Sequence, residues 1–169
     1  MTQNNEALLG RLQENYVQFV VIGGVCSVYY GVPIVTFDLD ICCRFDEPNL
    51  RRIEAAVGDL HPIHRLAANK LPLELTSELC LRLKNLYLQT DLGILDCLSE
   101  VAGVGGYEEV LRQSVTGELL FGKFPFLTMD ALIAAKQAVG RDRDLETLKH
   151  LRAIKEKLAH KAPPPKPSA

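Results

Sequence analysis

The spacing of apolar and polar positions divides the chain into short helices and strands. Over residues 4–16, three leucines recur at helical intervals and predict an amphipathic helix. Residues 17–22 form a β-branched apolar run that ends in Gly23-Gly24, which predicts a buried strand stopped by glycines. The following segment, 25–31, predicts a short helix that closes at a glycine.

A second strand and a capped helix are predicted next. The strand covers residues 34–45, and the helix covers residues 46–58. Asp46 is the candidate N-cap of this helix, Pro48 suits its first position and Gly58 suits its end.

The rest of the chain predicts a mixture of strands and helices before a proline-rich end. Its segments are an irregular stretch at 61–80, two strands within 81–101 that turn at 91–93, a short helix at 106–114, two short strands within 117–128, and helices at 128–139 and 142–158. The last helix is expected to bury one face, made of Leu145, Leu148, Leu151 and Ile154. This order predicts an α+β fold with a small central sheet and a helical C-terminal region. We expect one domain over residues 1–160 and a disordered tail over 161–169.

Composition narrows the classes of protein that the chain can represent. The formal net charge is -2, which argues against a protein whose main role is to coat nucleic acid through a basic surface. The five cysteines form no C-x-x-C motif and no secretory signal is visible, so we expect reduced, buried thiols in a cytoplasmic protein. No apolar run approaches the roughly 20 residues that span a bilayer, so no membrane segment is expected.

Two acids in the second strand are the first candidates for chemistry. Side chains alternate along a strand, so Asp38 and Asp40 point the same way. Neighbouring carboxylates stay ionised only where cations or hydrogen-bond donors neutralise them, and Mg²⁺ prefers such oxygen ligands. The alternative is a solvent-facing sheet edge, where acids oppose edge-to-edge pairing.

A third acid on a neighbouring strand would complete a site for phosphoryl displacement. Asp91 and Asp96 are the two candidates, and we favour Asp96. Asp91 lies at the turn, whereas Asp96 lies among apolar residues, where an acid is costly without a partner.

The glycine pair before the acids is a candidate phosphate site. Gly23-Gly24 stands at a strand-to-helix turn, where backbone N–H groups can converge on an anion, and Ser27 could add a hydroxyl. The alternative is a tight turn that merely needs small residues.

Together these residues resemble a known family. The stretch GGVCSVYYGVPIVTFDLDI, residues 23–41, is similar to the signature of the nucleotidyltransferase superfamily that includes DNA polymerase beta. Residues 90–111 and 127–151 resemble small bacterial stand-alone nucleotidyltransferase-like proteins, which are related to abortive-infection and toxin–antitoxin nucleotidyltransferases. The resemblance covers roughly residues 17–155 and implies a nucleotidyltransferase-like small mixed sheet flanked by helices, with a C-terminal helical pair.

The resemblance also implies roles for individual residues. It makes Asp38, Asp40 and Asp96 metal-binding and catalytic, with Gly23, Gly24 and Lys136 as nucleotide-binding residues. Arg141 and Asp144 match the C-terminal pattern, or else simply join and cap two helices. Ile34 departs from the pattern, because relatives often carry a basic residue there. We interpret His61 and His64 as ordinary loop residues.

The expected activity is transfer of a nucleoside monophosphate from a nucleoside triphosphate (NTP) to a hydroxyl acceptor, with Mg²⁺ or Mn²⁺ as cofactor. The acceptor is left open among RNA, protein and small molecules, and a toxin–antitoxin partner is a further expectation. A non-catalytic binding protein or antitoxin-like partner of the same fold is the alternative, and a metal-dependent phosphodiesterase is a third hypothesis.

Overall fold

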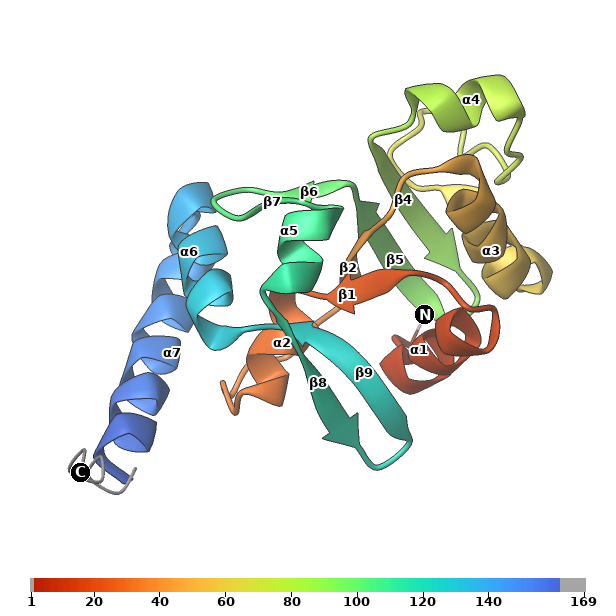
Figure 1. The fold of residues 1–169 in the computed structure, drawn as a ribbon. Coiled ribbons are helices and arrows are strands. Elements are labelled where there is room, and N and C mark those ends of the chain that lie inside the picture. Colours follow the sequence, from red (N-terminus) through yellow and green to blue (C-terminus); the bar gives the residue numbers. More distant parts are fainter. Residues whose placement is uncertain (1, 162–169) are drawn as a thin grey trace, which may run out of the picture.

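The computed structural model describes residues 2–161, and a seven-stranded mixed sheet lies at its centre (Figure 1). In spatial order the strands are β3 (Ile63–His64), β4 (Asn85–Thr90), β5 (Gly93–Leu98), β2 (Asp38–Cys43), β1 (Phe19–Val21), β9 (Gly122–Leu127) and β8 (Ser114–Leu119). The β2–β5 and β1–β9 pairs are parallel, and the other neighbours are antiparallel. A separate two-stranded ribbon pairs β6 (Glu100–Val101) with β7 (Gly105–Gly106).

The helices surround this sheet. They are α1 (Asn5–Glu14), α2 (Gly23–Tyr29), α3 (Glu47–Val57), α4 (Ser77–Arg82), α5 (Tyr107–Arg112), α6 (Met129–Val139) and α7 (Asp142–Lys161), with a 3₁₀ turn at Gly58–Leu60. Helices α6 and α7 form a C-terminal pair at the end of the molecule away from α3 and α4 (Figure 1). The predicted α+β class, the mixed sheet and the C-terminal helical pair are therefore confirmed. Of the predicted tail 161–169, Lys161 ends α7, and the remainder lies outside the described residues.

Local signals explain where several helices begin and end. The carboxylate of Asp46 accepts a hydrogen bond from the backbone N–H of Asn49, and Thr128 caps α6 in the same way. Gly140 ends α6 with a φ of 65°, the left-handed conformation that glycine adopts readily. Pro48 is the second residue of α3, one position later than predicted.

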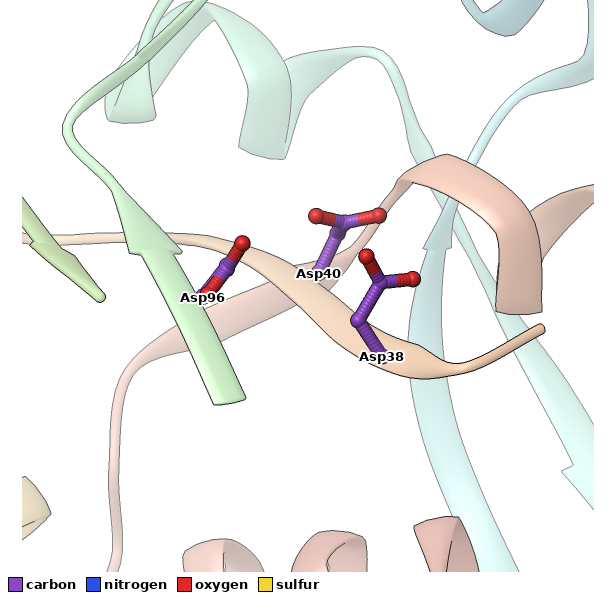
Figure 2. A group of neighbouring side chains, drawn as sticks. All are labelled: Asp38, Asp40 and Asp96. Atoms are coloured by element: carbon purple, nitrogen blue, oxygen red, sulfur yellow. The ribbon is translucent and has the colours of Figure 1, made fainter. Parts of the chain in front are cut away.

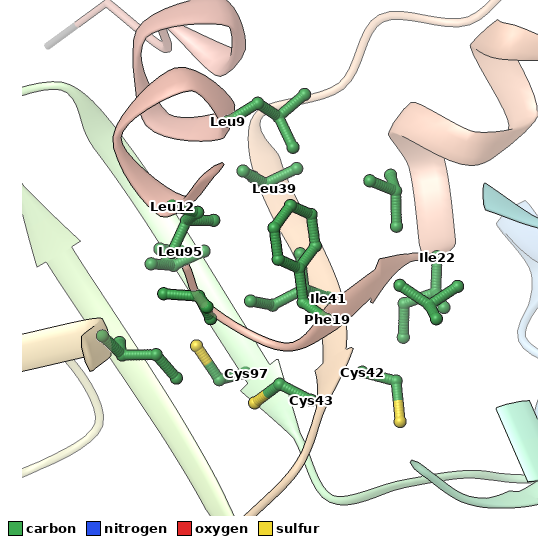
Figure 3. Packing of buried hydrophobic residues seen from close by; sticks show 14 of the residues in the cluster. Leu9, Leu12, Phe19, Ile22, Leu39, Ile41, Cys42, Cys43, Leu95 and Cys97 are labelled. Atoms are coloured by element: carbon green, nitrogen blue, oxygen red, sulfur yellow. The ribbon is translucent and has the colours of Figure 1, made fainter. Parts of the chain in front are cut away.

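The hydrophobic core packs the sheet against the surrounding helices, and Figure 3 shows the part of it beside the first helix. Leu8, Leu9 and Leu12 of α1 are fully buried in this core, and Leu9 and Leu12 lie near the strand residues Leu39 and Leu95. All five cysteines are free and buried, as predicted, and three of them lie in the packed region of Figure 3. Free cysteine packs there as a small hydrophobic side chain.

Several predicted boundaries and one predicted face need correction. The predicted helix at 106–114 ends earlier, because Ser114 begins β8, and α4 crosses the predicted boundary at residue 80. Strand β2 begins at Asp38 rather than at residue 34, and α2 begins at Gly23 rather than at residue 25. Leu145 is half exposed, although the spacing of apolar residues predicts it on the buried face of α7. At 3.6 residues per turn, a series spaced by three drifts around the helix, and the buried face is centred near Leu151 instead. Leu145 lies about 120° from that centre.

Within residues 2–161, none of the helices combines the length and apolar character needed to cross a membrane.

Candidate active site

Two adjacent parallel strands bring the three predicted aspartates together (Figure 2). Asp40 of β2 is in register with Asp96 of β5, and Asp38 precedes Asp40 by two residues on the same face. One carboxylate oxygen from each aspartate lies within 4.8 Å of the others. Leu39 and Ile41 point into the core on the opposite face and are fully buried. The alternation of side chains along β2 therefore places the acids on one face of the sheet, and the buried leucine and isoleucine hold the strand in the core from the other face.

Asp91 does not join this cluster. It lies at the β4–β5 turn, where its Oδ2 is 2.7 Å from Nδ1 of His61, and both side chains are exposed. His64 belongs to the edge strand β3, and neither histidine lines the cleft that contains the aspartates. The choice of Asp96 over Asp91 as the acid beside Asp38 and Asp40 thus agrees with the observed geometry.

Electrostatic strain is concentrated on Asp40. Burial, followed by repulsion from Asp38 and Asp96, raises the pKa of Asp40 to about 6. The backbone N–H of Gly24 and the ammonium of Lys136 oppose this rise in pKa. Burial also raises the pKa of Asp96, against the opposing effect of Arg65. A cation at the cluster would relieve the repulsion between these carboxylates.

Glycine is required at the turn beside the cluster. Gly23 has a φ of 64°, and a Cβ atom there would lie 2.1 Å from Oδ2 of Asp40. A Cβ atom on Gly24 would lie 2.7 Å from Cγ2 of Thr36. The backbone of this turn therefore approaches the acids more closely than any other residue type would allow.

Ser27 is not part of the cleft. Its side chain is fully buried, and its hydroxyl donates a 3.0 Å hydrogen bond to the carbonyl oxygen of Gly23, one helical turn earlier. The structure thus separates Ser27 from the other predicted nucleotide-binding residues, because its hydroxyl is used inside α2.

Arg65 is a member of the site that sequence reasoning missed. Its guanidinium contacts both carboxylate oxygens of Asp96, with Nε 3.0 Å from Oδ1 and Nη2 bonded to Oδ2. It also lies over the ring of Tyr87, 5.4 Å from the ring centroid. Arg65 follows the two-residue strand β3 in a stretch without clear periodicity, so local sequence gave no signal for its contact with Asp96.

Lys136 of α6 also lines the cleft. Its Nζ is 2.8 Å from Oδ1 of Asp144, whose other oxygen accepts a 3.0 Å bond from Nε of Arg141. The side chain of Asp144 is 1% exposed, and these two cations together lower its pKa against the effect of burial. Asp144 thus joins α6 to α7 and also fixes a lysine that faces the site.

A cleft of about 680 Å³ connects these groups. Its wall includes Gly23, Gly24, Ile34, the three aspartates, Arg65, Tyr87, Lys136, Arg141, Arg143 and Asp144. This volume falls in the range of about 300–1,000 Å³ that is usual for small-molecule sites. The wall thus carries both carboxylates, which can bind a cation, and basic side chains, which can contact phosphate.

The residues of the cluster fit a hard divalent cation. Three carboxylates supply oxygen ligands, and among residues 2–161 no basic side chain lies within 4.0 Å of the carboxylate oxygens of Asp38 or Asp40. Asp38 and Asp40 are therefore the ligands that most need a cation, while Asp96 already has Arg65.

Comparison with known proteins supports the fold. No protein-family model matches the chain, and no curated protein matches it in sequence. A candidate nucleotidyltransferase from Thermotoga maritima superposes with a TM-score of 0.54 at 19% identity, over 88% of this chain and 89% of that one. ANT(2″)-Ia in complex with adenylyl-2″-tobramycin superposes with a TM-score of 0.53 at 14% identity, over 91% and 94%. The chain therefore has the fold of these nucleotidyltransferases, as its sequence motifs predict.

Proposed function

We propose that the protein is a metal-dependent nucleotidyltransferase that moves a nucleoside monophosphate from an NTP to a hydroxyl acceptor. The observation that carries this proposal is the convergence of Asp38, Asp40 and Asp96 beside the Gly23-Gly24 turn. The shared fold with ANT(2″)-Ia supports it, because that protein was solved with an adenylylated compound.

The proposed roles of the individual residues follow from the positions of the charged side chains. Asp38 and Asp40 would hold Mg²⁺ or Mn²⁺. When bound, such a cation neutralises phosphate charge and orients the α-phosphate. The Gly23-Gly24 turn lines the same cleft and would lie beside the triphosphate, and Lys136 offers a positive charge on the cleft wall.

In the proposed reaction, the hydroxyl oxygen of the acceptor attacks the α-phosphorus of the NTP. A new oxygen–phosphorus bond forms, the bond from the α-phosphorus to the α–β bridging oxygen breaks, and pyrophosphate leaves. Asp96 is placed to take the hydroxyl proton. Positioning and charge neutralisation supply most of the catalysis in such a transfer.

A small molecule is the acceptor class that we favour. The cleft volume of about 680 Å³ suits an NTP with a small acceptor rather than a macromolecular one. The adenylylated compound bound to ANT(2″)-Ia is also a small molecule. A net charge of -2 gives no support to a long nucleic acid as acceptor. The expected toxin–antitoxin partner still rests on sequence resemblance alone.

A non-catalytic nucleotide-binding protein is the second candidate. The observation that favours it is the pairing of Arg65 with Asp96, which engages the acid that would accept the proton. Ile34 also favours the non-catalytic candidate, because it lies on the cleft wall at a position where relatives often carry a basic residue.

Label transfer distinguishes the two candidates. The protein is incubated with α-³²P-labelled NTPs, Mg²⁺ or Mn²⁺, and separate pools of RNA, protein and small molecules from cells. We expect the wild type to label the small-molecule pool and release pyrophosphate, and the Asp38→Ala, Asp40→Ala double variant to do neither. Asp91→Asn, which changes an exposed acid outside the cluster, is the matched control and should retain transfer. Equal inactivity of the wild type and the double variant, with NTP binding retained, would favour the non-catalytic candidate.

A further inference from the structure

The three aspartates of the site differ in how their charge is balanced. Asp96 has both oxygens engaged by the guanidinium of Arg65. By contrast, Asp38 and Asp40 have no basic side chain within 4.0 Å of their carboxylate oxygens in the part of the chain that the structure describes. The cluster therefore has one acid that is already neutralised and two that are not.

The structure holds Arg65 in place from two sides. The backbone N–H of Arg65 donates a 3.0 Å hydrogen bond to the carbonyl oxygen of Tyr87, which extends the pairing between β3 and β4. The ring of the same tyrosine supports the guanidinium. The side chains of Arg65 and Asp96 are 26% and 7% exposed, so this is a part-buried bidentate pair rather than a mobile surface contact.

We propose that Arg65 takes the place of a second divalent cation at Asp96, so that the site binds a single divalent cation, held by Asp38 and Asp40. This inference rests on the proposed function, because it specifies how the same acidic cluster is used. Two-metal sites place their cations about 3.5–4 Å apart, with carboxylates as shared ligands. Because the guanidinium of Arg65 contacts both carboxylate oxygens of Asp96, its positive charge would oppose a second cation at this carboxylate.

The arrangement gives Asp96 a different role from its two neighbours. Arg65 balances the charge of Asp96 and fixes the orientation of its carboxylate, and the remaining lone pairs stay available to an acceptor hydroxyl. Arg65 is in this sense a positioning residue, since it acts through Asp96 and not directly on the reacting atoms.

A charge-matched double variant tests the proposal through metal binding alone. Mn²⁺ is titrated into the full chain without nucleotide, and free Mn²⁺ is followed by its electron paramagnetic resonance signal. Arg65→Gln with Asp96→Asn removes one positive and one negative charge, so the net charge of the cluster is kept. We expect one Mn²⁺ per chain in the wild type and in the double variant, with affinities that agree within about fivefold, because Asp96 is not a ligand.

Arg65→Gln alone frees Asp96 and is expected to bind Mn²⁺ about tenfold more tightly, because it adds ligand charge.

Asp40→Asn separates failure of this inference from failure of the proposed function. It should weaken Mn²⁺ binding by more than about tenfold, because it removes a direct charged ligand. If the wild type binds no Mn²⁺, or Asp40→Asn binds it as well as the wild type, the metal site and the proposed function both fail. If Asp40→Asn weakens binding but the double variant also loses more than about fivefold, Asp96 is a ligand and only the inference about Arg65 is overturned. Two Mn²⁺ ions on the wild-type chain would overturn it as well.

Discussion

At the scale of single residues, Gly23 is the position where the backbone and the site constrain each other most directly. Its φ of 64° is unfavourable for residues with a Cβ atom, and that atom would meet the carboxylate of Asp40 at 2.1 Å. The closeness of this turn to the acids therefore depends on the identity of one residue.

Gly23→Ala is expected to lower the free energy of unfolding by about 1–3 kcal/mol through backbone strain and the clash with Asp40. Gly10→Ala is the matched control in α1, where a Cβ atom would have no other atom within 4 Å. The control should be neutral or stabilising by up to about 1 kcal/mol, because alanine favours a helix interior. Urea denaturation measures both changes. Equal stability of the two variants would contradict the claim that Gly23 is required by its backbone conformation and its contact with Asp40.

The raised pKa of Asp40 predicts an unusual dependence of stability on pH. The folded state holds the proton of Asp40 up to about pH 6, whereas an unfolded chain releases it near pH 4. In metal-free buffer, Asp40 should therefore reduce the free energy of unfolding as pH rises through this window, by on the order of 2–3 kcal/mol.

Asp40→Asn isolates this contribution, because asparagine resembles a protonated aspartate in shape but cannot ionise. Denaturation midpoints between pH 4 and pH 7 should show the variant gaining stability relative to the wild type as pH rises. A constant difference between the two proteins across that range would contradict the raised pKa.

The members of the candidate site could be predicted from the sequence where their placement depends on local spacing. Asp38 and Asp40 share a face because of the period of a strand, and Gly23-Gly24 lies where β1 passes into α2, as the first two residues of that helix. Arg65 could not be found in this way, because its contact with Asp96 joins residues 31 positions apart and depends on the pairing of β3 with β4. Proximity in sequence to the glycine pair predicts Ser27 in the nucleotide site, whereas its hydroxyl donates a hydrogen bond within its own helix.

At the scale of elements, the joint between α6 and α7 determines how Lys136 faces the cleft. The side chain of Asp144 is 1% exposed and forms ion pairs with Lys136 and Arg141. These ion pairs link the end of α6 to the start of α7. The sequence pattern placed Leu145 on the buried face, but the buried stripe of α7 includes the polar residues Asp144 and Thr147. A search for apolar positions alone misses a stripe that carries a buried ion pair.

Asp144→Ala is expected to lower the free energy of unfolding by about 3 kcal/mol, because it leaves Lys136, whose side chain is only 14% exposed, without its partner. Lys155→Ala is the control, since Lys155 and Asp130 form an exposed ion pair between the same two helices. That change should cost less than about 1 kcal/mol. Thermal denaturation compares the two variants, and a larger loss in the control would show that Asp144 does not have this role.

At the scale of the whole molecule, the class and element order could be predicted, whereas the order of strands in the sheet could not. Hydrophobic periodicity predicted β4, β5, α6 and most other elements because each depends on its own residues. The parallel pairing of β2 with β5 joins distant segments, and this pairing brings Asp96 beside Asp40. Family resemblance supplied that long-range information, and the structural comparisons agree with it at the level of fold.

The central claim is that the acidic cluster binds a nucleotide through a divalent cation, and calorimetric titration tests it without knowledge of the acceptor. Each of the four α,β-methylene NTP analogues is titrated into the wild type and Asp40→Asn, with Mg²⁺ and again with EDTA. The account predicts saturable binding of at least one analogue at one per chain, lost in EDTA and weakened more than about tenfold in Asp40→Asn. Binding that is equal with and without metal, and equal in both proteins, would contradict it.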